Sequence, residues 1–293
     1  MKLRFCTLLC TAAIALTAHA APPPAEVQAV QSPAWLERNG QRVALTAGHP
    51  VHSGDVIVSG ENARVMLGLA DGSQIKLGDD GRFALDKLTV QGSAGNTTVD
   101  ASLRLLKGFF RYSSSALGKL MNKRNIDLRV STATIGIRGT DYWAMTDEVH
   151  DAVCVFDGKV EVATQDQGTL TLDQPTAFWA RFFEKPAQPV GIATPTELAR
   201  FIATVEPVPG DGITVINGRW RVVAAAENTS AGAQAIARAL RDKGYPAQLA
   251  KSYGRNEVRL DAFATRADAE AVLKRLSVQP GLTGSNAKVM ATR

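Results

Sequence analysis

The chain has 293 residues, of which 45% are hydrophobic and 21% charged, a composition typical of a folded globular protein. After the first twenty residues no apolar run reaches the ~20 residues that a membrane-spanning helix needs. The formal net charge is only +5, but residues 213–293 hold 13 Lys and Arg against 6 Asp and Glu, a net charge of +7. These numbers exclude disordered, collagen-like and polytopic membrane classes, and they allow about two domains.

Residues 1–20 have the pattern of an export signal. Lys2 and Arg4 precede an apolar stretch over residues 5–16, and Ala18-His19-Ala20 supplies the small residues of a cleavage site. The sequence therefore predicts a signal peptide that is cut after Ala20 and a mature protein in the periplasm. The alternative is an apolar helix kept as an anchor, for which the stretch is short.

Cleavage would leave Cys154 as the only cysteine, because Cys6 and Cys10 belong to the signal. No disulfide within the mature chain is then possible. Cys154 lies in an apolar run over residues 152–156, which favours a small buried side chain over a reactive thiol.

Residues 43–173 are predicted to form an all-β domain, a sandwich or a rolled sheet. Short runs rich in β-branched and apolar residues alternate with Gly, Asp and Asn, and Asp71-Gly72 marks a hairpin turn between strands at 63–69 and 73–77. Further strands are expected at 83–90, 103–112, 126–131, 142–147, 152–156 and 160–164. Residues 21–42 are interpreted as an N-terminal lead-in.

Residues 174–212 contain six prolines and are predicted to be a linker with one short helix at 196–205. In residues 213–293 the hydrophobic pattern alternates between the period of strands and the period of helices. Strands are expected at 220–226, 248–251, 257–262 and 287–290, and one helix at 230–243. A second helix is expected to start after Thr265, with Thr265 and Asp268 forming a capping box. The order β-α-β-β-α-β predicts a small ferredoxin-like α+β fold with one sheet face uncovered.

The β domain resembles the FecR family over residues 54–162. The resemblance implies a periplasmic β domain used in scaffolding or signalling, with an envelope protein as its possible partner. It is carried by Gly54-Asp55, Asp71-Gly72-Ser73, Leu106-Lys107-Gly108, Ser131-Thr132-Ala133, Gly136 to Thr140, and Asp157-Gly158 with Val160 and Val162.

A structural motif is expected at Asp71, Gly72, Arg138, Gly139 and Thr140. Glycine suits a backbone with positive φ, and the guanidinium of a part-buried Arg138 needs a carboxylate partner such as Asp71 or Asp157. Arg138 is therefore interpreted as structural, and ligand binding is the alternative.

The last part resembles a SPOR domain, which implies binding to peptidoglycan glycan strands that have lost their stem peptides. Trp220-Arg221-Val222 and residues 240–245, 258–263 and 267–271 carry the resemblance. Strand alternation directs Val222, Ala224, Leu249, Val258, Leu260 and Val289 to the helices. The predicted peptidoglycan-binding residues on the open face are Arg221, Val223, Gln248, Arg259, Asp261 and Lys288.

Three other classes of function are alternatives to wall binding. His49 and His52 could start a metal site, but no third ligand has a diagnostic spacing, and no catalytic or phosphate-binding motif is present. The open face lacks the aromatic residues of RNA-binding sheets. The sequence therefore predicts a non-enzymatic protein without cofactor, metal or nucleic acid. The alternative is a periplasmic FecR-type signalling or interaction module that does not bind the cell wall.

Overall fold

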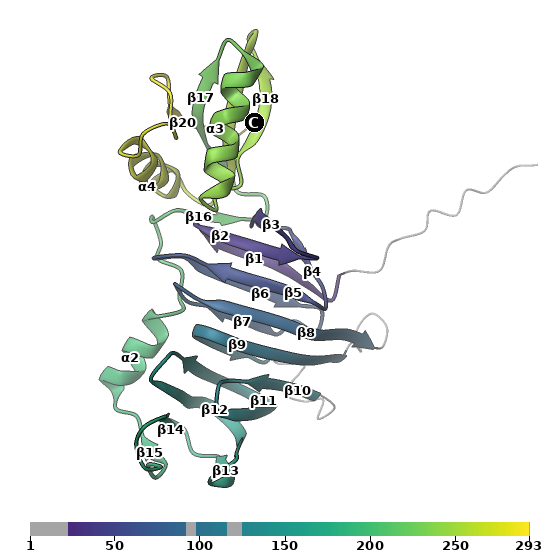
Figure 1. The fold of residues 1–293 in the computed structure, drawn as a ribbon, viewed down its shortest axis with the longest axis vertical. Coiled ribbons are helices and arrows are strands. Elements are labelled where there is room, and N and C mark those ends of the chain that lie inside the picture. The colour runs from purple at the N-terminus through teal and green to yellow at the C-terminus, as the bar shows by residue number, and fades with distance from the viewer. Residues whose placement is uncertain (1–22, 92–97, 116–124, 293) are drawn as a thin grey trace, which may run out of the picture.

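The computed structural model describes residues 23–91, 98–115 and 125–292 of the chain. A tall stack of β-strands carries a smaller α+β part at one end, and helix α2 lies along one side of the stack (Figure 1). Within the described residues no helix has both the length and the apolar composition to cross a membrane.

The stack is a sandwich of two layers, which is one of the two architectures predicted for it. One layer is formed by β1 (Ala25–Gln31), β4 (Pro50–Val51), β6 (Arg64–Leu69), β7 (Gln74–Leu77), β14 (Ala177–Phe182) and β15 (Gly191–Ile192). The other is formed by β2 (Ala34–Arg38), β3 (Gln41–Ala44), β5 (Asp55–Ser59), β8 (Arg82–Gln91), β10 (Asn125–Arg129) and β13 (Gly168–Leu172).

Three long strands, β9 (Thr98–Ser113), β11 (Ala133–Thr146) and β12 (His150–Thr164), belong to both layers. The first half of β9 pairs with β8 and β10, and its second half pairs with β7 and β11. Each long strand turns between the layers at a glycine with positive φ: Gly108 at 98°, Gly139 at 63° and Gly158 at 89°. Glycine is suited to these corners because it has no Cβ to clash when φ is positive.

The main hydrophobic core lies between the two layers. It follows from period-two alternation, because every second residue of a strand faces the opposite layer. Its largest buried side chains include Leu36, Ile57, Leu67, Ile75, Phe83, Phe110, Tyr112 and Tyr142.

Residues 25–42, expected to lead into the β domain, form β1, β2 and the start of β3 inside it. Strand β1 pairs with β6 from Ala25 to Gln31, and Val27 and Leu36 belong to the core. This segment contains several Ala, Gln and Glu residues, so its own preference for strand is weak. It forms strands because it pairs with strands that are distant in the sequence.

Residues 174–212, expected to link two domains, are packed along the sandwich. Helix α2 (Pro195–Ala203) starts at Thr194 with a capping box, within one residue of its predicted start. Phe201 of α2 stacks on Trp143 with ring centroids 4.2 Å apart, and Trp143 Nε1 donates to Thr204 Oγ1. Further on, Glu206 accepts from Lys76 and Arg111 on the same outer face.

The C-terminal part consists of β16 (Ile213–Val215), β17 (Trp220–Glu227), α3 (Ser230–Asp242), β18 (Gln248–Ser252), β19 (Arg255–Phe263), α4 (Arg266–Ser277) and β20 (Lys288–Ala291). The strands and helices predicted here are confirmed to within two residues, as is the capping box of Thr265 and Asp268. The strands pair in the order β18, β19, β17, β20. Both helices pack through a second core on one side of this sheet.

Strand β16 joins the two parts by pairing with both. Residues 213–215 pair with β1 of the sandwich, and Thr214 also pairs with Phe263 of β19. The Thr214 hydroxyl donates to the carbonyl of Val30 over 3.0 Å. The C-terminal part is therefore hydrogen-bonded directly to the end of the sandwich.

Candidate functional site

The face of the C-terminal sheet opposite α3 and α4 brings the predicted binding residues together. By strand register Gln248 lies beside Arg259, Arg259 beside Val223, and Val223 beside Lys288. These four residues form one row across all four strands, which we call the central row. Arg221 and Asp261 lie in the neighbouring row, so all six predicted residues share one face.

Ion pairs hold the two arginines of this face in place. Arg221 Nε lies 2.5 Å from Asp261 Oδ1, and Arg259 Nη2 lies 2.7 Å from Glu257 Oε2. The two arginine side chains are about one-fifth exposed, at 21% and 20%. Each guanidinium has five N–H donors, so a carboxylate partner leaves donors for a ligand.

Val223 belongs to the central row but offers no surface, because its exposed fraction is 0%. It lies between Arg259 and Lys288 in the register of the sheet, and its burial corrects its expected role as a residue that contacts the ligand. Gln248 and Lys288 are exposed at the two ends of the row.

The helix-facing side of the sheet is mostly as expected. Val222, Ala224, Val258 and Leu260 are buried in the second core, and Val289 is packed against it. Leu249 differs, since 44% of its side chain is exposed. It lies on β18, which pairs only with β19 among the described strands, so no neighbouring strand covers it.

The open face is suited chemically to a polymer of sugars. Arg and Lys donors can bind the hydroxyl and N-acetyl oxygens of several sugar rings in sequence. Each such hydrogen bond contributes only about 0.5–1.5 kcal/mol net, so binding requires several rings at once. An extended row across four strands provides that arrangement.

The motif residues of the sandwich have structural surroundings. Asp71 Oδ1 accepts from Ser73 N over 2.9 Å in the predicted turn, and Gly72 there has a φ of 80°. Thr140 is fully buried beside the corner at Gly139. The side chain of Arg138 lies outside the described residues, so its predicted partner stays a prediction.

His52 belongs to a cluster around the buried carboxylate of Asp55. Arg38 donates to both oxygens of Asp55, over 2.6 and 2.7 Å, and its Nη2 lies 2.9 Å from His52 Nδ1. Burial lowers the pKa of His49, and the charge of Arg38 lowers it further. Among the described residues no group of three His, Cys, Asp or Glu could hold a metal ion.

Cys154 is buried on the outer side of the sandwich under α2, next to Trp143 and Phe178. Burial raises the pKa of its thiol to about 12. The thiolate is the reactive form of cysteine, so this position is inert at neutral pH, as its apolar surroundings in the sequence suggested.

Two family models match the chain. Residues 55–161 match FecR protein and residues 217–286 match the SPOR domain. The chain thus contains a FecR domain followed by a C-terminal SPOR domain, as its motifs indicated. The second match includes β17, β18 and β19 of the open face and ends two residues before β20.

Among solved structures, the chain is similar to two crystal structures of "a putative anti-sigma factor" from Parabacteroides distasonis. One has 13% identity and a TM-score of 0.37, with 50% of this chain and 64% of that chain covered. The other has 12% identity and a TM-score of 0.38, with 81% and 98% covered. No curated protein matches the chain.

Proposed function

We propose that this protein is an exported, non-enzymatic component of the bacterial envelope that binds peptidoglycan through its SPOR domain. The open face binds glycan strands without stem peptides, and the FecR domain is presented to an envelope protein for scaffolding or signalling. The SPOR match supports wall binding, and the FecR match supports a signalling module. The signal peptide and the periplasmic location belong to the proposal, because residues 1–22 lie outside the described part of the chain.

The central row is the observation on which this proposal depends most. It sets Gln248, Arg259 and Lys288 in one row, with Val223 between the last two, on a face that neither α3 nor α4 covers. The element order of residues 220–291 further supports a ferredoxin-like βαββαβ class for this domain. Such a fold places both helices on one side, so the sheet itself is the surface for a ligand.

Wall binding is tested by sedimenting the full chain with cell-wall sacs whose stem peptides have been removed by an amidase. The double variant Arg221→Ala with Arg259→Ala is expected to lose at least tenfold in affinity, because it removes two donor groups from neighbouring rows. Alanine is preferred to glutamate here, since a new carboxylate would repel Asp261 and Glu257.

The matched control is Arg266→Ala with Lys274→Ala. It removes the same charge from two exposed positions on α4, which packs on the other side of the sheet. It is expected to bind like the wild type. Equal affinity of the Arg221/Arg259 variant and this control, with melting temperatures unchanged, would reject the open face as the binding surface.

One observation favours the alternative of a signalling or interaction module without wall binding. Both arginines of the open face are already paired with carboxylates, and Val223 is buried. Under this alternative the wild-type chain does not sediment with the stripped sacs, while the FecR domain still captures its partner.

A further inference from the structure

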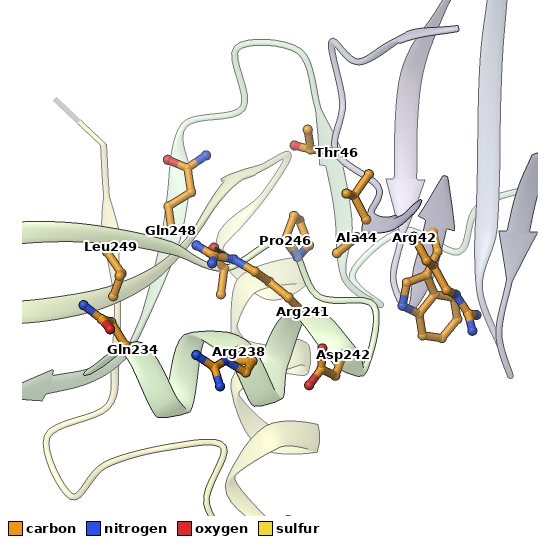
Figure 2. A pocket seen from close by; sticks show the side chains of 13 residues that line it. Arg42, Ala44, Thr46, Gln234, Arg238, Arg241, Asp242, Pro246, Gln248 and Leu249 are labelled. Carbon is orange, nitrogen blue, oxygen red and sulfur yellow. Dashed lines mark hydrogen bonds between the residues drawn. The ribbon is translucent and has the colours of Figure 1, made fainter. Parts of the chain in front are cut away.

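A groove separates the sandwich from the SPOR domain at the edge of strand β18. Its volume is about 890 Å³. The β2–β3 hairpin forms one wall, while helix α3 and the first residues of β18 form the other (Figure 2). The side chains that line it include Arg42, Arg238, Arg241, Gln248 and Leu249.

The two walls are fixed relative to each other. Gly244, which follows α3, accepts a hydrogen bond at its carbonyl from Ala34 N over 3.2 Å. Trp35 packs so closely on Gly244 that a Cβ there would lie 2.8 Å from the indole ring. Arg241 Nε donates to the carbonyl of Ala247 over 2.7 Å, which anchors this side chain at the groove. The groove is therefore already formed in the free protein.

The groove is strongly basic. Three arginines and one acidic residue, Asp242, line it. Arg42 lies over the ring of Trp35 at 4.0 Å. Its nearest carboxylate, Glu37, is 3.9 Å away and binds Arg82 more closely, at 2.6 Å. The three positive charges that line the groove outnumber its one negative charge. A ligand of complementary charge is therefore an anion.

The groove is continuous with the open face through Gln248. This residue lines the groove and also begins the central row beside Arg259. A polymer that lies along the central row therefore reaches the groove where it passes the edge of β18. Leu249, exposed at the same edge, adds an apolar contact for a sugar ring.

We propose that this groove binds a carboxylate carried by the glycan strand, an inference that rests on the proposed function. A stem peptide is joined to the strand through an amide. When water cleaves that amide, the amine leaves with the peptide and the acyl carbon stays on the sugar as a carboxylate. A strand that keeps its peptides has no charge at this position. Arginines that bind the carboxylate thus make the protein selective for stripped strands.

The test compares two preparations of amidase-stripped strands, one with free carboxylates and one in which a carbodiimide and methylamine have converted them to neutral amides. The full-length wild type is expected to bind the neutral strands about tenfold more weakly. Added NaCl should weaken its binding to the charged strands much more than to the neutral ones.

The variant Arg42→Gln with Arg238→Gln is expected to bind both preparations equally, at the affinity of the wild type for neutral strands. The control Arg266→Gln with Lys274→Gln removes the same charge from α4, outside both the groove and the open face, and should behave as wild type. Equal binding of the wild type to both preparations, or wild-type affinity of the groove variant for charged strands, would overturn the groove proposal. Failure of the wild type to bind either preparation would instead reject the proposed function.

Discussion

Replacing Gly108 with alanine is expected to lower the free energy of unfolding by about 3 kcal/mol. The backbone at Gly108 has a φ of 98°, and such a conformation costs an alanine roughly 1–3 kcal/mol. A Cβ there would also lie 2.7 Å from the Cα of Gly81, so the main chain itself would have to shift. Overpacking of this kind costs about 1–3 kcal/mol.

Gly168→Ala is the matched control, measured by the same denaturant titration. Gly168 has a φ of 70°, but no heavy atom of the other described residues lies within 4 Å of the place that an added Cβ would take. It should therefore show the backbone cost alone, about 1 kcal/mol. Equal losses of stability in the two variants would show that the corner at Gly108 is not sterically restricted.

Replacing Asp268 with alanine is expected to destabilise the SPOR domain by about 3 kcal/mol. This carboxylate is 1% exposed and accepts four hydrogen bonds. One oxygen accepts from the backbone N–H groups of Gly212 and Ile213, over 3.1 and 3.0 Å, and the other accepts from the N–H and hydroxyl of Thr265. Alanine removes the Asp268 half of the capping box of α4 and leaves buried donors without this partner, which costs about 1–3 kcal/mol for each such group.

Glu270→Ala on the same helix is the control. Glu270 is exposed and, within the described part of the chain, forms an ion pair only with Arg266 one turn away, so its loss should cost at most about 0.5 kcal/mol. Because Asp268 also holds the start of β16, hydrogen exchange at residues 213–215 should rise in Asp268→Ala but not in Glu270→Ala. Unchanged exchange at those residues would show that β16 is held by its strand pairing alone.

Helices and strands could be predicted from the sequence where the hydrophobic periodicity and the residues at their ends agreed. Thr265 and Asp268 located the start of α4, and the alternation of Val258 and Leu260 assigned the faces of β19 correctly. Strand β17 was harder, because its pairing with β19 shifts register after Trp220 and again after Val223. As a result four successive residues, 222–225, are buried, which strict alternation does not predict.

Long-range contacts account for what the sequence could not show. The glycines at 108, 139 and 158 belong to the motifs that carry the FecR resemblance, and Gly108 was expected within a strand. Their role as corners between layers depends on which strands pair on each side. The basic groove likewise needs Arg42 of the hairpin and Arg238 of α3 to meet across the domain boundary. The spacing of Arg238 and Arg241 on one helix was the only local sign of it.

Hydrogen exchange of the full chain with and without soluble stripped glycan fragments tests the central claim most directly. Sugars bound on the open face should slow exchange in β17, β19 and β20, around Arg221, Arg259 and Lys288, while α3 and α4 keep their rates apart from the groove end of α3. Protection confined to the outer surfaces of the two helices, or no protection in the C-terminal sheet at saturating fragment, would contradict the account.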